Sequence, residues 1–260
     1  MQIKKLSVHR PSKRSLSDLT DLEFGCYLAG LIDGDGHIST QGHIVISFNS
    51  RDKRDAFLIR TRLGFGKVRQ VKNKNAVNLI ISNKNGVIYT LELIRNKLKH
   101  PTRIYQFNDR LCDKLKYTKL KTSLSNTIDW NSFWFSGFVD ADGYLRIYLP
   151  YSEHRNKCEV RLLCQIDQKG DILLNQIRNK FSGYLGYRKS QDTFYYSSTS
   201  FKNMYYLLKY FDRYSLQNTH CYLRYTIIRK AYLIIQNKLH LTSKGLDKIF
   251  RYNNSLKDMI

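Results

Sequence analysis

The spacing of apolar residues along this chain changes in an order that occurs twice. Each occurrence begins with helical spacing, continues with two alternating stretches, returns to helical spacing, and closes with two more alternating stretches and further helical spacing. The first begins near Leu22 and the second near Trp134. The pattern predicts an α+β protein made of two similar repeats, each with the element order αββαββα.

The alternating stretches predict strand pairs in both repeats. In the first repeat, HISTQGHIVISF contains a turn, and Lys67–Val71 is paired with Val77–Ser82. In the second repeat, YLRIYLPY is paired with CEVRLLCQID, and Leu185–Lys189 with Phe194–Thr199. Helical spacing predicts helices in RDAFLIRTRLGFGKV, NGVIYTLELIRNKL, RIYQFNDRLCDKL, GDILLNQIRNKFSGYLG, KNMYYLLKYFDRYSL and CYLRYTIIRKAYLII.

The segment between the repeats, Tyr117–Asp129, is rich in Lys, Ser and Thr and has little to bury, which predicts a linker. We expect the repeats to span residues 20–124 and 125–240, with residues 241–260 as a C-terminal tail. Residues 1–19 are basic and contain no acid before Asp18, which fits an organellar presequence or a disordered arm that contacts nucleic acid. This stretch has no clear amphipathic period, and that favours the arm.

One motif occurs in both repeats, as YLAGLIDGDGHI at Tyr27–Ile38 and as WFSGFVDADGYL at Trp134–Leu145. The first copy is preceded by Thr20 and Glu23, which match a capping box and predict the start of a helix. Small residues lie four apart on both motif helices, a spacing that lets two helix backbones approach closely. The motif helices are therefore predicted to pack on each other through Gly30, Gly34, Gly137 and Ala141.

Both motif helices are expected to end on an acid, Asp35 or Asp142, followed by a glycine stop at Gly36 or Gly143. The helix dipole disfavours a carboxylate there by ~0.3–1 kcal/mol, and packing the helices together adds repulsion between the two acids. Divalent cations would turn this repulsion into coordination, and Mg²⁺ favours sparse oxygen sites that water and phosphate complete. The paired acids therefore indicate metal-assisted hydrolysis of phosphodiesters.

The Asp-x-Asp-Gly sequence has two other interpretations. A single copy is usually an ordinary turn. A calcium loop of the EF-hand type also begins Asp-x-Asp, but its fifth position is an oxygen ligand and its twelfth is Glu. Here those positions hold His37, Tyr144, Ile44 and Tyr151, which excludes the EF-hand. Asp33 and Asp140 are expected to bond helix-end or interface backbone rather than metal.

The chain has 260 residues and a formal net charge of +23, because Lys and Arg number 44 and Asp and Glu 21. Such an excess is typical of proteins with a polyanionic partner, and nucleic acid is the first candidate. An anionic membrane surface is the alternative, but the basic residues are spread along the chain and do not form one amphipathic anchor. The five cysteines form no C-x-x-C pair, and no uncharged apolar run reaches the ~18 residues of a membrane span.

LAGLIDGDG and FSGFVDADG closely resemble the two signature motifs of the LAGLIDADG homing endonucleases. The order of elements resembles that family's single-chain, two-repeat form over roughly Leu22–Leu239. The resemblance implies a monomer with an internal pseudo-twofold axis, in which two four-stranded antiparallel sheets form a saddle along the major groove of double-stranded DNA. It assigns metal binding to Asp35 and Asp142, beside Gly34 and Ala141.

The family also places basic or amide side chains around the attacking water. After the second strand of each repeat the candidates are Arg51, next to Ser50, and Gln168. Before the last helices, where the family often has lysine, the candidates are Arg103 and His220. A histidine would need a proton to replace a lysine there, and an ordinary solvated or phosphate-contacting residue is the alternative for both.

Side chains that alternate onto the exposed face of the predicted strands are candidates for contacts with base edges and phosphates. A plain solvent-exposed strand residue is the alternative for each. The candidates are Arg69, Asn78, Arg146, Tyr148, Arg161, Gln165 and Arg188.

We therefore expect a site-specific homing endonuclease that makes a staggered break at a long DNA target and promotes intron mobility. Mg²⁺ is the expected cofactor, Mn²⁺ a substitute, and Ca²⁺ is expected to support binding without cleavage. The alternative is an intron-RNA maturase or another nucleic-acid-binding module on the same fold, alone or as a second role. Members of the family often lie in introns of organelle genes, which implies the mitochondrion first and the chloroplast second, and no membrane partner is expected.

Overall fold

A computed structural model of the chain describes residues 5–113, 116–123, 125–152 and 157–259. The chain is divided into two compact units. The motif-helix unit comprises Lys13–Asp142 and Tyr214–Thr219, and the second-sheet unit comprises residues 5–12, Gly143–Arg213 and residues 220–259. Both motif helices therefore belong to the motif-helix unit.

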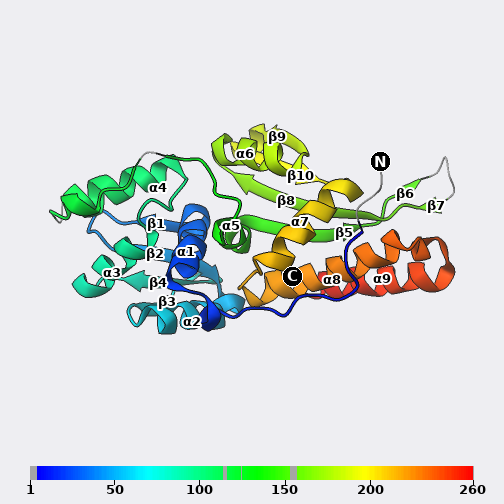
Figure 1. Cartoon of the computed structure of the whole chain (residues 1–260), viewed down its shortest axis with the longest axis horizontal. Helices are drawn as coiled ribbons and strands as arrows, with labels where there is room; N and C mark the ends of the chain where they lie inside the picture. The colour runs from blue at the N-terminus through cyan, green and yellow to red at the C-terminus, as the bar shows by residue number, and fades with distance from the viewer. Residues whose placement is uncertain (1–4, 114–115, 124, 153–156, 260) are drawn as a thin grey trace. The chain divides into compact units, whose positions relative to one another are not determined.

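Four antiparallel strands form the sheet of the motif-helix unit, in the order β1-β2-β4-β3 (Figure 1). Alternate residues such as Ile46, Val77 and Leu79 are fully buried, so one face of this sheet is apolar. Ile59 and Leu63 of α2 (Lys53–Leu63) are buried as well, in a helix that packs on the sheet. The strands are β1 (Gly36–Ile38), β2 (Ile44–Asn49), β3 (Lys67–Gln70) and β4 (Ala76–Ile81).

The helices of this unit follow the predicted order. They are α1 (Asp21–Asp35), α2 (Lys53–Leu63), α3 (Lys84–Ile94), α4 (Pro101–Gln106) and α5 (Trp134–Asp142). A π-helical segment at Phe107–Asp113 continues α4. Short 3-10 turns lie at Leu16–Asp18, Ser50–Asp52 and Thr118–Leu120.

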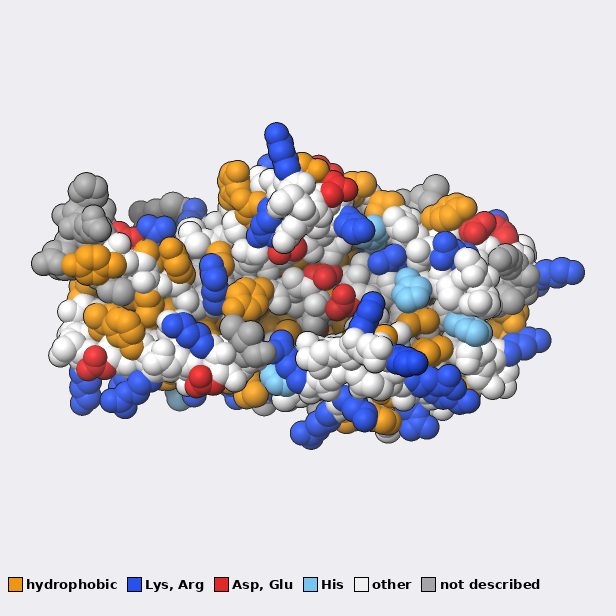
Figure 2. Space-filling view, turned by 180° about the vertical axis from the view of Figure 1, so that it is seen from behind, with side chains coloured by type: hydrophobic (Ala, Val, Ile, Leu, Met, Phe, Trp, Pro, Cys, Tyr) orange, Lys and Arg blue, Asp and Glu red, His pale blue; other side chains and the backbone are white. Residues whose placement is uncertain are grey.

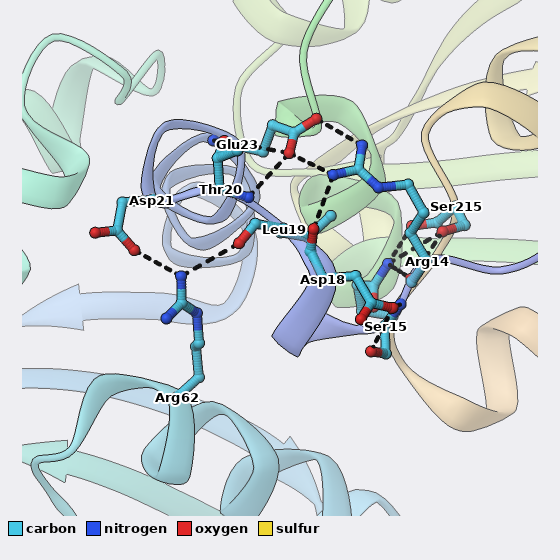
Figure 3. Close-up of polar contacts among 10 residues, drawn as sticks. Arg14, Ser15, Asp18, Leu19, Thr20, Asp21, Glu23, Arg62 and Ser215 are labelled. Carbon is cyan, nitrogen blue, oxygen red and sulfur yellow. Dashed lines mark hydrogen bonds and ion pairs between the residues drawn. The ribbon is translucent and has the colours of Figure 1, made fainter.

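The start of α1 has the capping box that the sequence predicts. The Thr20 hydroxyl accepts a hydrogen bond of 3.3 Å from the Glu23 N–H, and the Glu23 carboxylate accepts one of 3.0 Å from the Thr20 N–H (Figure 3). Arg14 donates to both oxygens of Glu23, which lowers the pKa of Glu23 to about 2. Arg62 of α2 donates to Asp21 at 2.6 Å. A cap of this kind contributes ~1 kcal/mol, and the ion pairs fix the first turn of α1 to its neighbours.

The second-sheet unit has a sheet of the same design, with the strand order β5-β8-β10-β9 (Figure 1). Its apolar face contains buried residues such as Ile147, Ile166 and Tyr196. The strands are β5 (Gly143–Tyr148), β8 (Arg161–Gln168), β9 (Tyr184–Arg188) and β10 (Thr193–Ser198), and a short hairpin of β6 (Tyr151–Ser152) and β7 (Lys157–Cys158) lies between β5 and β8. The helices are α6 (Ile172–Phe181), α7 (Phe201–Arg213), α8 (Thr219–Gln236) and α9 (Ser243–Lys257). The α+β class and the two four-stranded antiparallel sheets are thus confirmed.

Residues 5–9 and the C-terminal segment Ser243–Lys257 are bonded or packed within the second-sheet unit. The Leu6 backbone exchanges hydrogen bonds of 2.7 and 3.1 Å with the Gln236 side chain, and Arg229 donates to the carbonyls of Ser7 and His9. Residues 5–9 are therefore not a free arm. The C-terminal tail forms α9, in which Ile249 is fully buried.

The compact units divide the chain after Asp142, whereas the predicted repeats meet near Ser125. The difference arises because α5 packs on α1 and is counted with it. The boundary between the repeats stays a prediction. Among the helices that the structure describes, none is both long and apolar enough to cross a membrane.

Candidate functional site

The two motif helices, α1 and α5, are in backbone contact. A methyl group added to Gly30 would lie 1.9 Å from the carbonyl oxygen of Trp134, and one added to Gly137 would lie 2.0 Å from the carbonyl oxygen of Tyr27. No side chain fits at such distances. The two glycines thus make reciprocal contacts that bring the helices together, as the predicted stripe of small residues requires.

The same stripe continues to the ends of the helices. A methyl group on Gly34 would lie 2.4 Å from the Cβ of Ala141 and 2.6 Å from a carboxylate oxygen of Asp142. Gly34 directly precedes Asp35, the last residue of α1, and Asp142 is the last residue of α5. The structure therefore brings the two predicted metal-binding acids to one place.

Gly36 caps the end of α1, where the sequence predicts a glycine stop. Its φ of −95° and ψ of 165° are extended. A methyl group there would lie 2.6 Å from the Cα of Ile32, so the position needs glycine for space rather than for its backbone angles.

Charge at this site is unusual for a helix end. Burial raises the pKa of Asp35 to about 6, although Arg103 acts to lower it and solvent still reaches the side chain. Burial also lowers the pKa of Arg103, against the attraction of Asp33, Asp142 and Asp35. Arg103 donates a hydrogen bond of 3.3 Å to the Ile32 carbonyl near the end of α1. Arg103 is therefore within electrostatic reach of both terminal acids.

The donors at this site fit a hard divalent cation. Asp35 and Asp142 provide carboxylate oxygens, which are the ligands that Mg²⁺ prefers, and a cation would stabilise the ionised form that burial disfavours at Asp35. No group of three or more His, Cys, Asp or Glu that could hold a metal occurs among the described residues. The fit is therefore to a sparse site, which water and phosphate would complete.

Asp33, the other acid of the first motif, bonds to protein. Its carboxylate accepts hydrogen bonds from the backbone N–H of Lys99 at 2.6 Å, the N–H of His100 at 3.1 Å and the indole N–H of Trp134 at 2.8 Å. Burial raises the pKa of Asp33 to about 7. Asp33 thus holds the segment before α4 and the start of α5 to the end of α1.

Asp140 has the matching role in the second motif. One oxygen of its carboxylate accepts hydrogen bonds from the N–H of Gln217 at 2.7 Å, the N–H of Asn218 at 2.9 Å and the Tyr27 hydroxyl at 3.0 Å. Burial raises its pKa to about 7. As expected, Asp33 and Asp140, the inner acids of the two motifs, bond helix-end and interface groups.

Two donors in this arrangement were not predicted, Tyr27 and Trp134. They occupy the same position in the two motifs, and each donates to the inner acid of the other helix. A signal for them was present, because both are aromatic residues with a polar group that seeks a partner when buried.

The remaining catalytic candidates lie on three different elements. Arg51 lies on the 3-10 turn after β2, with its Nε 3.9 Å from a carboxylate oxygen of Asp52. Gln168 is the last residue of β8, and His220 lies in the first turn of α8. Gln168 and His220 belong to the second-sheet unit, whereas Asp35, Asp142, Arg103 and Arg51 belong to the motif-helix unit. Of the six candidates, the structure shows Asp35, Asp142 and Arg103 together.

The candidates for DNA contact lie on the side of each sheet opposite most of its buried residues. Arg69 and Asn78 are direct partners in the register of β3 and β4. Tyr148 and Arg161 are direct partners in the register of β5 and β8. The other candidates on this side of the second sheet are Arg146, Gln165 and Arg188. Lys and Arg side chains also outnumber Asp and Glu on the face that Figure 2 shows.

Comparison with known proteins identifies a family and several relatives. The family model described as LAGLIDADG endonuclease matches residues 135–232. An uncharacterized cox1 intron-2 protein of Schizosaccharomyces pombe is 41% identical over 250 residues, which cover 95% of this chain and 76% of that protein.

Two further relatives are more distant. Probable intron-encoded endonuclease 4 of Neurospora crassa is 26% identical, over 90% of this chain and 44% of that protein. Intron-encoded RNA maturase bI4 of Saccharomyces cerevisiae is 26% identical, over 71% of this chain and 28% of that protein. The chain thus spans less than half the length of either.

Solved structures have the same fold. I-SmaMI bound to an uncleaved DNA target in the presence of calcium ions aligns with a TM-score of 0.68 at 20% identity, over 90% of this chain and 98% of that one. The LAGLIDADG meganuclease I-CpaMI bound to uncleaved DNA aligns with a TM-score of 0.67 at 17% identity, over 89% and 98%.

Proposed function

This chain belongs to the LAGLIDADG endonuclease family, and we propose that it is a site-specific DNA endonuclease that cuts both strands of a long duplex target and leaves a staggered break. The protein would act as a monomer, because its two motif helices already supply both acids.

The observation that carries the proposal is the meeting of two acids at the ends of α1 and α5. Each acid is at the end of a helix where the dipole disfavours negative charge, and the Asp142 carboxylate lies against Gly34, next to Asp35. Burial adds to the unfavourable energy of an ionised Asp35. In both motifs a carboxylate lies at the negative end of a helix dipole and close to a second carboxylate. Two unfavourable features that occur together in both motifs are typical of a functional site.

Asp35 and Asp142 would hold the divalent cation, beside Gly34 and Ala141. Bound Mg²⁺ would supply an activated water and stabilise the leaving oxygen of a phosphodiester. Mn²⁺ is expected to substitute, and Ca²⁺ to support binding without cleavage. The I-SmaMI structure with uncleaved DNA in the presence of calcium ions supports that expectation by similarity.

The basic and amide residues would act on the phosphate and the attacking water. Arg103 stabilises the negative charge that develops on the phosphate, because it is close to both acids and only partly exposed. Arg51, Gln168 and His220 orient the attacking water or bind adjacent phosphates.

The exposed sides of the two sheets would bind the DNA. Seven polar or basic candidates lie there, and the whole chain has a net charge of +23. Binding is expected to weaken with salt, with log K falling by roughly 0.9 per phosphate contact for each tenfold rise in salt.

The relative from Schizosaccharomyces pombe indicates where a target can be sought, since it is a cox1 intron-2 protein. We propose that this chain acts in the mitochondrion on the uninterrupted form of a cox1 gene, where a break would promote insertion of the intron. The chloroplast is the alternative location.

The test is cleavage of a labelled duplex that spans an uninterrupted cox1 intron-2 insertion point. The wild-type protein is expected to cut both strands in Mg²⁺ and only to bind in Ca²⁺. Asp35→Asn and Asp142→Asn should each abolish double-strand cleavage and retain binding, whereas Asp192→Asn, which removes an exposed acid from a turn, should cut like the wild type. Cleavage by the Asp35→Asn, Asp142→Asn double variant would refute the proposal.

The second candidate function is that of an intron-RNA maturase, which the likeness to maturase bI4 favours. It predicts tighter binding to cox1 intron RNA than to the intronless DNA, together with faster splicing of that RNA. The same titration with both nucleic acids decides between the functions, and comparable affinities with both activities would indicate a dual role.

A further inference from the structure

Asp167 lies between two of the DNA-contact candidates on the exposed side of the second sheet. Its carboxylate forms an ion pair of 2.9 Å with Arg188 of β9. The side-chain nitrogen of Gln165, two residues earlier on β8, lies 3.2 and 3.1 Å from the two oxygens of the same carboxylate. One acid thus engages both Gln165 and Arg188.

The Arg188 side chain is also supported by an aromatic ring. Its guanidinium lies 4.4 Å from the centre of the Tyr195 ring, at a distance that is typical of a cation–π contact. The Tyr195 ring lies across Gly186, where an added methyl group would be 2.5 Å from the ring. Gly186 therefore leaves the space that Tyr195 needs in order to support Arg188.

The chemistry of Asp167 fixes how Gln165 is turned. A side-chain amide can present either its oxygen or its nitrogen to a ligand, but an ion-paired carboxylate only accepts hydrogen bonds. The amide nitrogen must therefore face Asp167, which turns the amide oxygen away from Asp167 as an acceptor that Gln165 can offer to a ligand. Arg188 uses one nitrogen on Asp167 and keeps its other donors.

We propose that Asp167 determines part of the DNA specificity of this protein by orienting Gln165 as an acceptor and Arg188 as a donor. In the major groove an acceptor selects the exocyclic amino group of adenine or cytosine, and an Arg donor selects the O6 and N7 of guanine. Asp167 acts through these two residues and is a positioning residue. The inference rests on the proposed function, because it presumes that this side of the sheet reads DNA.

The test is the base preference of the Asp167→Asn protein. An asparagine keeps the shape but removes the ion pair with Arg188, and its own amide can bond to either end of the Gln165 amide. We expect preference to fall at one or two positions of the target, from on the order of 10-fold for the favoured base to about 2-fold. Preference at the other positions should stay as in the wild type.

The measurement uses a pool of duplex DNA with a randomised central segment, selected by retention on the protein and then sequenced. Asp192→Asn is the matched control, because Asp192 is an acid in the turn between β9 and β10 and accepts a hydrogen bond of 2.7 Å from the Tyr187 hydroxyl. The control loses the same charge and should keep the wild-type preferences. Thermal unfolding of both variants checks that neither has lost structure.

Gly186→Ala provides a second variant, since it displaces Tyr195 and leaves Asp167 with Gln165. It should broaden preference only at the position that Arg188 reads. If the wild type enriches a defined sequence and Asp167→Asn enriches it with the same preferences, the inference is wrong although the protein reads DNA. If the wild type enriches no sequence, the proposed function fails instead.

Discussion

The Trp134 indole at the start of α5 donates a hydrogen bond of 2.8 Å to the carboxylate of Asp33 near the end of α1. The reciprocal bond, of 3.0 Å, joins the Tyr27 hydroxyl to Asp140. Each motif helix therefore supplies a donor for Asp33 or Asp140 of the other helix.

The inner acids predict unequal effects for the same substitution. Asp33 accepts through both oxygens, so an amide at this position must turn its nitrogen toward a backbone N–H. The three bonds to Asp140 described above reach one oxygen, which an amide oxygen can replace. Burial disfavours the ionised form of both acids to a similar degree, so Asp33→Asn should be less stable than Asp140→Asn, by about 1–3 kcal/mol in the free energy of unfolding.

Urea unfolding of both variants at about pH 8, where an acid with a pKa of about 7 is mostly ionised, measures this difference. The two acids are buried to a similar degree, so each variant serves as the control for the other. Equal losses of stability would show that acceptor geometry is not what distinguishes them.

The contact between the motif helices predicts a large effect from one methyl group. In Gly30→Ala the new Cβ would lie 1.9 Å from the Trp134 carbonyl oxygen, so the helix backbones must separate. We expect the free energy of unfolding to fall by ~3 kcal/mol or more.

Gly170→Ala is the matched control, because a methyl group there meets nothing within 4 Å and the residue lies outside the left-handed region. The control should unfold within about 1 kcal/mol of the wild type in thermal denaturation, and similar behaviour of the two variants would contradict the close contact.

Much of this arrangement could be predicted because its causes are local. Thr20 and Glu23 lie three residues apart and together cap the start of α1. The four-residue spacing of Gly30 and Gly34 indicates a helix contact face, whichever helix packs on it. The alternation of polar residues likewise placed Arg69 and Asn78 on one side of a sheet.

The rest depends on partners that are distant in sequence. Asp33 bonds to Lys99 and His100, which lie 66 and 67 residues away, and no periodicity links them. The Leu6 N–H donates a hydrogen bond to the side chain of Gln236, 230 residues further along the chain. α9 lies outside the repeated pattern, so the repeat does not predict it.

Asp35 predicts a stability that depends on pH in the metal-free protein. Its folded pKa of about 6 is above the ordinary value of 3.8, so the folded state holds the proton more tightly. Its contribution to stability is therefore present below pH 3.8 and is lost as pH rises through about 6. Over this range the Asp35→Asn protein should become more stable than the wild type, by ~1 kcal/mol in the free energy of unfolding at high pH. This value is smaller than the full pKa shift implies, because solvent reaches the side chain.

Chemical unfolding of both proteins from about pH 4 to pH 8, first in a chelator and then in Mg²⁺, measures this effect. In Mg²⁺ the order should reverse at high pH, since a ligand that binds only the folded wild type stabilises it. Parallel pH profiles in the chelator would show that Asp35 is not disfavoured as an ion, and no change in Mg²⁺ would argue against a metal site.

Replacing Arg103 should lower the rate of DNA cleavage without lowering the affinity for DNA to the same extent. It is close to Asp35 and Asp142 and donates to the Ile32 carbonyl, so its charge acts where the scissile phosphate would lie. Arg103→Ala should slow single-turnover cleavage by ~10²-fold or more, as removal of a positioned donor does in other enzymes. Arg103→Lys should recover part of the rate, because it keeps the charge and loses the fork of donors.

Arg62→Lys is the control, since Arg62 pairs with Asp21 at the opposite end of α1 and should leave the rate unchanged. A fall in DNA affinity that accounts for the whole loss in Arg103→Ala would make Arg103 a phosphate-binding residue rather than a catalytic one.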